Sequence, residues 1–265
     1  MAHLIKLDGR RALVTGGGRG IGRSIALALA KAGADVAVAA RSKAELETVA
    51  SEIEAAHRRA LPLVLDLMSR DAIGAGVKRA AEELGGLEIL VNNAGGTIHA
   101  GANLLNPLDH DPQAFEDNIF LNLIQAFYTT RSALPYMLKQ KWGRIINIGS
   151  SGGDHHGMGP VSYATAKHGL VGFTRSMAYA LAPHGININV ISPGLTETRV
   201  LDWQQLAQAY KVATAEEARN KAVDKTALKR VLDPDEFGPV AVLLASDHGA
   251  AITGQVIGVD AGYLV

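Results

Sequence analysis

Tyr163 and Lys167 are the residues whose types and spacing point most directly to chemistry. They stand four residues apart in SYATAKHGL (162–170), a segment with the pattern of a helix, so both side chains lie on one helical face. A ketone that accepts a hydride must also accept a proton, and an alcohol that is oxidised must lose one. A free phenol ionises at about pH 10, which is too high for an efficient base at neutral pH. A nearby ammonium favours the phenolate, so the pair predicts a proton-transfer site with an acidified phenol.

Two more polar residues are candidates for the same site. Ser150 ends an apolar segment thirteen residues before Tyr163, and its hydroxyl can hydrogen-bond a substrate oxygen on which negative charge develops. Asn122 falls on the apolar side of a predicted helix, where a buried amide needs hydrogen-bond partners. It either takes part in catalysis or supports a helix kink or helix–helix contact. Reading Tyr163 and Lys167 as an amphipathic tyrosine beside a solvent-reaching lysine would leave these other features as coincidences.

A glycine-rich turn, TGGGRGIG (15–22), separates the first predicted strand from the first predicted helix. Glycines let the backbone approach a phosphate, and a helix N-terminus offers free N–H groups. We expect the turn to bind a dinucleotide. Its spacing differs from G-x-G-x-x-G, and the near match to a P-loop has Arg23 where the motif needs lysine. A nucleoside triphosphate site and a turn without a ligand are the alternatives.

The residues at the end of the second predicted strand bear on the type of dinucleotide. An acidic residue there holds the ribose hydroxyls of NAD(H), but this chain has Ala40 followed by Arg41. Arg19 in the glycine turn adds a second cation, and guanidinium groups bind a 2′-phosphate well. Two cations and no acid favour NADP(H), with NAD(H) and a merely solvated Arg41 as alternatives. Asp66 either accepts a hydrogen bond from the adenine or caps the following turn.

The elements that must position these residues alternate between short apolar segments and longer helical ones. This pattern predicts an α/β, doubly wound (Rossmann) three-layer sandwich with about seven parallel strands in the order 3-2-1-4-5-6-7. We expect one domain over 1–265, with a substrate lid within 195–232. The expected strands are 11–15, 35–40, 61–67, 87–92, 143–150, 185–192 and 254–262. The expected helices are 20–33, 43–59, 69–84, 112–139, 161–182, 200–222 and 234–246.

Composition excludes several other classes of protein. The chain has 26 basic and 26 acidic residues, so no overall field favours nucleic acid or an anionic membrane. It has no cysteine, which excludes disulfides and thiolate chemistry and fits a reducing cytoplasm. The start of the sequence lacks the apolar core of a signal peptide, and no apolar run is long enough to span a membrane. We expect a cytoplasmic protein without a metal site, and we assign no ligand role to His155 and His156.

Several motifs, taken together and in order, resemble the short-chain dehydrogenase/reductase family over essentially the whole chain. They are TGGGRGIG (15–22), NNAG (92–95), NL (122–123), GS (149–150), YATAK (163–167) and SPG (192–194). The resemblance implies that Tyr163 is the acid/base and that Lys167 lowers its pKa and binds the nicotinamide ribose. It further implies that Ser150 orients the carbonyl and that Asn122 holds a water in a proton relay. The cofactor residues expected from the motifs and the resemblance are Gly16, Gly18, Arg19, Gly20, Ile21, Gly22, Arg41, Asp66, Leu67, Asn93, Ala94, Gly95, Tyr163, Lys167, Pro193, Gly194, Thr196 and Thr198.

The predicted function is an NADP(H)-dependent oxidoreductase that interconverts a ketone and a secondary alcohol. Within the family the sequence is most similar to bacterial 3-oxoacyl-carrier-protein reductases, which implies a 3-oxoacyl substrate. The alternatives are an NAD-linked catabolic alcohol, polyol or steroid dehydrogenase, and a non-catalytic NADP-binding regulator. The family resemblance also implies a homotetramer that packs segments 112–139 and 161–182 across two-fold axes. Neither the substrate nor its stereochemistry follows from the sequence.

Overall fold

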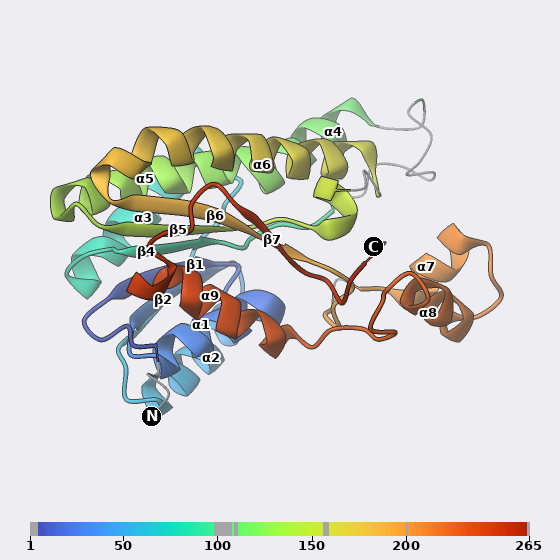
Figure 1. Ribbon diagram of the computed structural model, residues 1–265, viewed down its shortest axis with the longest axis horizontal. Helices are drawn as coiled ribbons and strands as arrows, with labels where there is room; N and C mark the ends of the chain where they lie inside the picture. Colours follow the sequence, from blue (N-terminus) through green and yellow to red (C-terminus); the bar gives the residue numbers. More distant parts are fainter. Residues whose placement is uncertain (1–4, 98–107, 109–110, 156–158, 200, 264–265) are drawn as a thin grey trace.

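A seven-stranded parallel sheet forms the centre of the molecule (Figure 1). The computed structural model describes residues 5–97, 108, 111–155, 159–199 and 201–263. The strand order is β3-β2-β1-β4-β5-β6-β7, which confirms the predicted topology. The strands are β1 (Arg11–Thr15), β2 (Asp35–Ala40), β3 (Ala60–Val64), β4 (Ile89–Asn92), β5 (Gly143–Ile148), β6 (Ile186–Pro193) and β7 (Val256–Val259).

Helices cover both faces of the sheet, as Figure 1 shows. One layer contains α1 (Gly20–Lys31), α2 (Lys43–Ala55) and α9 (Phe237–Ala245). The other contains α3 (Arg70–Leu84), α4 (Pro112–Ile119), α5 (Gln125–Gln140) and α6 (Val161–Leu181). The central strands are buried on both sides because helices cover both faces, and β5 and β6 are buried at every position. Two hydrophobic clusters result, one under each helical layer.

The predicted helix 112–139 is interrupted by a π-helical segment, Phe120–Ile124. Asn122 lies within it and is 1% exposed. Its amide donates to the carbonyl of Asn118 at 3.0 Å and to that of Gly96 at 2.8 Å. The prediction of one continuous helix relied on helical periodicity, which does not reveal a local π-helical turn. This turn places Asn122 against the loop after β4.

The predicted helix 200–222 is divided into α7 (Trp203–Tyr210) and α8 (Ala215–Val223). Lys211 ends α7 with a left-handed backbone (φ 54°), and the hydroxyl of Thr214 caps the start of α8. Figure 1 shows both helices beyond one end of the sheet, away from the two main layers. No helix among the described residues has the length and apolar character needed to cross a bilayer.

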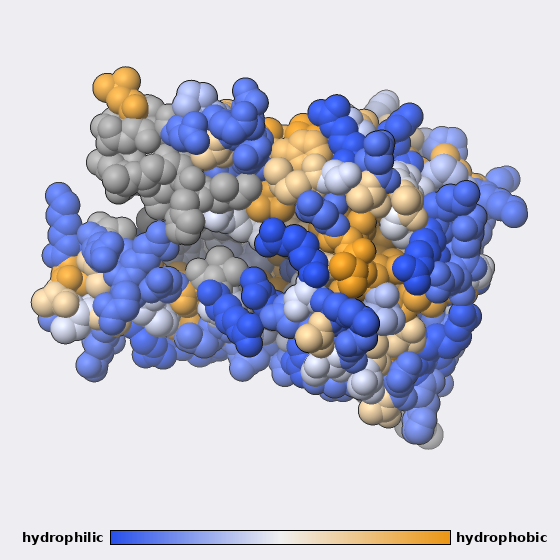
Figure 2. All heavy atoms as spheres, turned by 180° about the vertical axis from the view of Figure 1, so that it is seen from behind, coloured by the Kyte–Doolittle hydropathy of each residue, from blue (hydrophilic) through white to orange (hydrophobic). Residues whose placement is uncertain are grey.

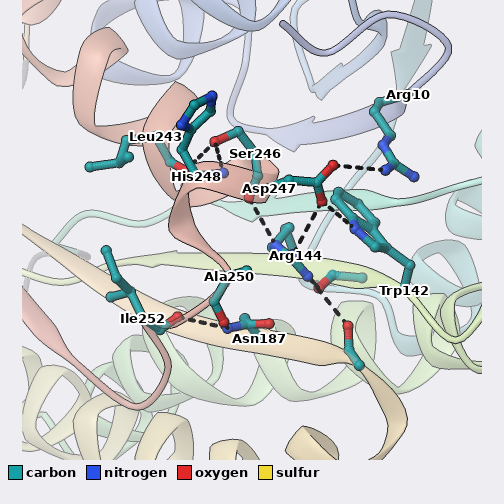
Figure 3. A network of polar contacts seen from close by, with 12 residues as sticks. Arg10, Trp142, Arg144, Asn187, Leu243, Ser246, Asp247, His248, Ala250 and Ile252 are labelled. Atoms are coloured by element: carbon teal, nitrogen blue, oxygen red, sulfur yellow. Dashed lines mark hydrogen bonds and ion pairs between the residues drawn. The ribbon is translucent and has the colours of Figure 1, made fainter. Parts of the chain in front are cut away.

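A polar cluster fixes the opposite end of the sheet (Figure 3). The ring of Trp142 has the guanidinium of Arg10 at 3.6 Å and that of Arg144 at 4.2 Å from its centroid. Its indole N–H donates to Asp247 at 2.8 Å. Nearby, the amide of Asn187 donates to two carbonyl groups, both at 2.9 Å. These contacts join β5 and β6 to the segment after α9, so this end of the sheet is held without any help from the site at the other end.

Candidate active site

A cavity of about 1170 Å³ lies at the carboxyl ends of the strands. Its lining brings together the glycine turn, the loop after β4, the end of β5, the start of α6 and the segment after β6. All eighteen predicted cofactor residues line it, and so does Ser150. Asn122 lies behind the wall instead of in it. Ligands bind at this edge in open α/β sheets, because the strand order reverses there between β1 and β4.

Two glycines of the turn, Gly16 and Gly22, are packed so tightly that a side chain would not fit there. A Cβ on Gly22 would lie 2.3 Å from the carbonyl oxygen of Gly16 and 2.4 Å from the amide nitrogen of Asn93. Gly16 has a φ of +63°, which favours glycine. The amide of Asn93 donates to the carbonyl groups of Thr15 and Gly16 at 3.0 and 3.1 Å. The turn therefore presents bare backbone at the start of α1, which fits the pyrophosphate of a dinucleotide.

Lys167 is buried (4% exposed) one helical turn after Tyr163. Its Nζ donates to the carbonyl of Ile148 at 2.8 Å and lies 5.6 Å from the centroid of the Tyr163 ring. Burial lowers the pKa of Lys167 from 10.5 to about 8. The amine is thus still mainly protonated at neutral pH, and the α6 spacing brings it to the phenol as predicted.

The Tyr163 phenol differs from the sequence-based expectation in one respect. Burial raises its pKa above 10.0, although the hydrogen bond with Ser150 acts in the opposite direction. The net shift is opposite to the expected acidification, because burial disfavours the charged phenolate. In this structure Tyr163 is a protonated phenol at neutral pH, which is the form that donates a proton.

Asn122 supports the wall of the cavity. Besides donating to Gly96, its side chain accepts the N–H of Gly96 at 3.0 Å. A Cβ on Gly95 would lie 2.8 Å from Oδ1 of Asn122 and 3.5 Å from Nζ of Lys167. The structure is compatible with both roles that the sequence left open for Asn122. The residue is part of the π-helical segment, and its side chain and that of Lys167 both lie near Gly95. The water relay implied by the family resemblance stays a prediction.

Asp154 lies next to the predicted site, and the sequence analysis gave it no role. Its buried carboxylate accepts the N–H of Ser150 at 2.8 Å and the hydroxyl of Ser192 at 2.8 Å. Its negative charge adds to the effect of burial in raising the pKa of Tyr163. The same charge opposes the effect of burial on Lys167, whose pKa is lowered overall. The only sequence signal was an acidic residue in a glycine-rich segment four positions after Ser150.

The strand β2 ends at Ala40, without the acidic residue typical of NAD(H) sites, but a carboxylate from α2 reaches this end of the cavity. Glu45, in the first turn of α2, lines the cavity together with Arg19, Arg41 and Arg199. Its Oε1 lies 3.6 Å from Arg19 and 3.1 Å from Arg199. The sequence signal was the Ser42-x-x-Glu45 spacing of a helix start, which predicts a first-turn position for Glu45 but not its approach to the glycine turn.

One of the two roles considered for Asp66 is present in the structure. Asp66 lines the cavity, and its carboxylate also accepts the N–H of Met68 at 3.0 Å, so it does cap the following turn. Within the described part of the chain, no three His, Cys, Asp or Glu residues are grouped to hold a metal ion. His156 and the side chain of His155 lie outside what the structure describes.

Comparison with known proteins identifies the class. The model of the short chain dehydrogenase family matches residues 10–209, and this chain belongs to that family. It is an oxidoreductase of a class that uses NAD(P)(H), and its fold and motifs agree with that class.

Individual relatives cover almost the whole chain. A 3-oxoacyl-(acyl-carrier-protein) reductase of Thermotoga maritima is 34% identical, covering 98% of this chain and 100% of the relative. A solved short-chain type dehydrogenase/reductase from Mycobacterium marinum has a TM-score of 0.84 at 35% identity, covering 98% and 97% of the two chains. A 7α-hydroxysteroid dehydrogenase complexed with NADH and 7-oxo-glycochenodeoxycholic acid has a TM-score of 0.86 at 30% identity, covering 98% and 96%.

Proposed function

We propose that this protein interconverts a ketone and a secondary alcohol with NADP(H), and that Tyr163 transfers the proton. The observation that carries the proposal is one continuous cavity, lined by the glycine turn at one end and by Ser150, Tyr163 and Lys167 at the other. A binding module needs only the first end. The non-catalytic regulator is therefore the weaker alternative, because it leaves the buried Lys167 and its phenol neighbour without a purpose.

The residues divide the work of carbonyl reduction. When bound, the nicotinamide supplies the hydride. The Tyr163 hydroxyl donates the proton to the carbonyl oxygen, since its raised pKa keeps it protonated at neutral pH. Ser150 hydrogen-bonds the same oxygen as negative charge grows there, and Asp154 fixes the backbone of Ser150. The ammonium of Lys167 stabilises the negative charge left on Tyr163.

The substrate class that we favour is a 3-oxoacyl thioester, on the strength of the 34% identity to the Thermotoga maritima reductase. The test is a panel of 3-oxoacyl thioesters, simple ketones and hydroxysteroids, each assayed with NADPH and with NADH by absorbance of the reduced nicotinamide. Reduction of 3-oxoacyl compounds at least tenfold faster than of the others supports the proposal. Oxidation of sterols or polyols with NAD alone contradicts it.

An NAD-linked dehydrogenase remains the second candidate because of one observation. Glu45 places a carboxylate beside Arg19, where a 2′-phosphate would be repelled. The solved steroid dehydrogenase relative was crystallised with NADH. Arg41 favours NADP(H), since among the described residues its guanidinium has no ion-pair partner and lines the cavity.

Assembly and the lid belong to the same proposal. We propose a homotetramer that buries exposed apolar side chains of α5 and α6, among them Phe127 (42% exposed) and Tyr179 (89% exposed). Figure 2 shows apolar atoms at the surface between polar side chains on one face of the molecule. We further propose that 195–232, with α7 and α8, forms the substrate lid. Light scattering tests the tetramer, and we also propose a cytoplasmic location.

A further inference from the structure

Glu45 contacts two arginines from different segments of the chain at the adenosine end of the cavity. Arg19 belongs to the glycine turn, and Arg199 follows β6. Both approach the same carboxylate oxygen of Glu45, at 3.6 and 3.1 Å, and Arg199 forms a hydrogen bond with it. The Glu45 side chain is 27% exposed, whereas those of Arg19 and Arg199 are 56% and 76% exposed. The carboxylate is thus the fixed member, and the two guanidinium groups are free to change partner.

The position of Glu45 is set by the start of α2. The hydroxyl of Ser42 caps this helix by accepting the N–H of Glu45. A Cβ on Gly18 would lie 3.2 Å from Cβ of Glu45, so the Glu45 side chain packs directly against the glycine turn. The segment after β6 reaches the same turn, since a Cβ on Gly20 would lie 3.4 Å from the methyl group of Thr198. Arg199 is therefore held near the turn by its neighbour as well as by Glu45.

The arginines at this end of the cavity attract an anion, and the carboxylate of Glu45 weakens that attraction. Arg19, Arg41 and Arg199 line the cavity, and Glu45 lies within ion-pair distance of two of them, Arg19 and Arg199. A phosphate ester near these groups gains guanidinium partners but meets the carboxylate of Glu45 as a like charge. A cofactor with plain ribose hydroxyls meets arginines that Glu45 already neutralises.

We propose that Glu45 sets the cofactor preference of this enzyme by competing with the 2′-phosphate of NADP(H) for Arg19 and Arg199. The carboxylate lowers the affinity for NADP(H) and leaves that for NAD(H) nearly unchanged, so the chain is a dual-cofactor enzyme with only a moderate preference for NADP(H). Binding of NADP(H) exchanges the Glu45–Arg199 pair for an arginine–phosphate pair. This inference rests on the proposed use of NADP(H).

The test measures dissociation constants of NADPH and NADH by nicotinamide fluorescence, without any substrate. Glu45→Gln should tighten NADPH binding about tenfold, the effect of removing one like charge from a dianion in a partly exposed site. NADH binding should change less than about twofold, and the NADPH gain should shrink as salt rises. Glu47→Gln is the matched control, since Glu47 is on the same helix, is 56% exposed and forms an ion pair with Lys43 instead of with a cavity residue. It should leave both constants unchanged.

A second variant separates competition from a structural role. Arg199→Gln should weaken NADPH binding more in the Glu45→Gln background than in the wild type, because Arg199 is then no longer shared. Equal losses in the two backgrounds would overturn the proposal. It would also be overturned if Glu45→Gln changed the preference only by weakening NADH, or weakened both cofactors alike. Thermal unfolding of each variant checks that α2 is intact.

The outcomes also separate this inference from the proposed function. If the wild type binds neither nucleotide, the proposed function is wrong and this inference with it. If the wild type binds both and Glu45→Gln behaves like Glu47→Gln, only this inference is wrong.

Discussion

Replacing Asn122 by alanine tests how the cavity wall is built. The substitution removes three hydrogen bonds of a 1% exposed side chain: those to the N–H and carbonyl of Gly96 and to the carbonyl of Asn118. At about 1 kcal/mol net for each bond, the free energy of unfolding should fall by about 3 kcal/mol. For a chain of this size that corresponds to a melting temperature about 6–12 °C lower. Calorimetry measures the shift directly.

The matched control is Asn187→Ala. Asn187 is also buried and donates to two carbonyl groups, but at the opposite end of the sheet (Figure 3). Losing two bonds should lower its melting temperature by about 4–8 °C and leave turnover at 20 °C unchanged. Asn122→Ala should lower both, since the support for Gly95 and Gly96 is lost. A melting temperature of Asn122→Ala within about 1 °C of the wild type would refute the reasoning, as would equal turnover losses in the two variants.

Three further predictions concern charge, backbone space and stability. Asp154→Asn removes the negative charge that raises the pKa of Tyr163, so the pH profile of alcohol oxidation, which needs the phenolate, should move to lower pH; an unchanged or upward-shifted profile would contradict this. Gly22→Ala should weaken nucleotide binding at least tenfold, because its Cβ would lie 2.3 Å from a carbonyl oxygen; Gly172→Ala, with nothing within 4 Å, is the control and should bind normally. Trp142→Phe loses an indole hydrogen bond of 2.8 Å and should lower the free energy of unfolding by about 1–2 kcal/mol without changing turnover, as thermal unfolding and kinetics would show.

The parts of the site that the sequence predicts are those set by spacing within one element. Tyr163 and Lys167 meet because they are four apart in α6, and the glycine turn is recognised because it joins β1 to α1. The parallel sheet follows from the alternation of strands and helices, and its order is the one typical of dinucleotide-binding folds. In each case the predicted feature depends on the order or spacing of residues along the chain.

The parts that it does not predict depend on packing between distant segments. Glu45 reaches the glycine turn only because α2 packs beside it, and Arg199 arrives from beyond β6. The π-helical segment at Asn122 depends on the loop after β4. The raised pKa of Tyr163 follows from burial, which no residue spacing measures.

The most direct test of the central claim is Tyr163→Phe. The change removes the hydroxyl that donates the proton and leaves the ring and the glycine turn in place. Turnover should fall at least a thousandfold, at the upper part of the range of about 10²–10⁴ for a lost general acid. The dissociation constant of NADPH, measured by fluorescence on the same sample, should change less than about threefold. Turnover within tenfold of the wild type would contradict the account, because the proton would then come from another group.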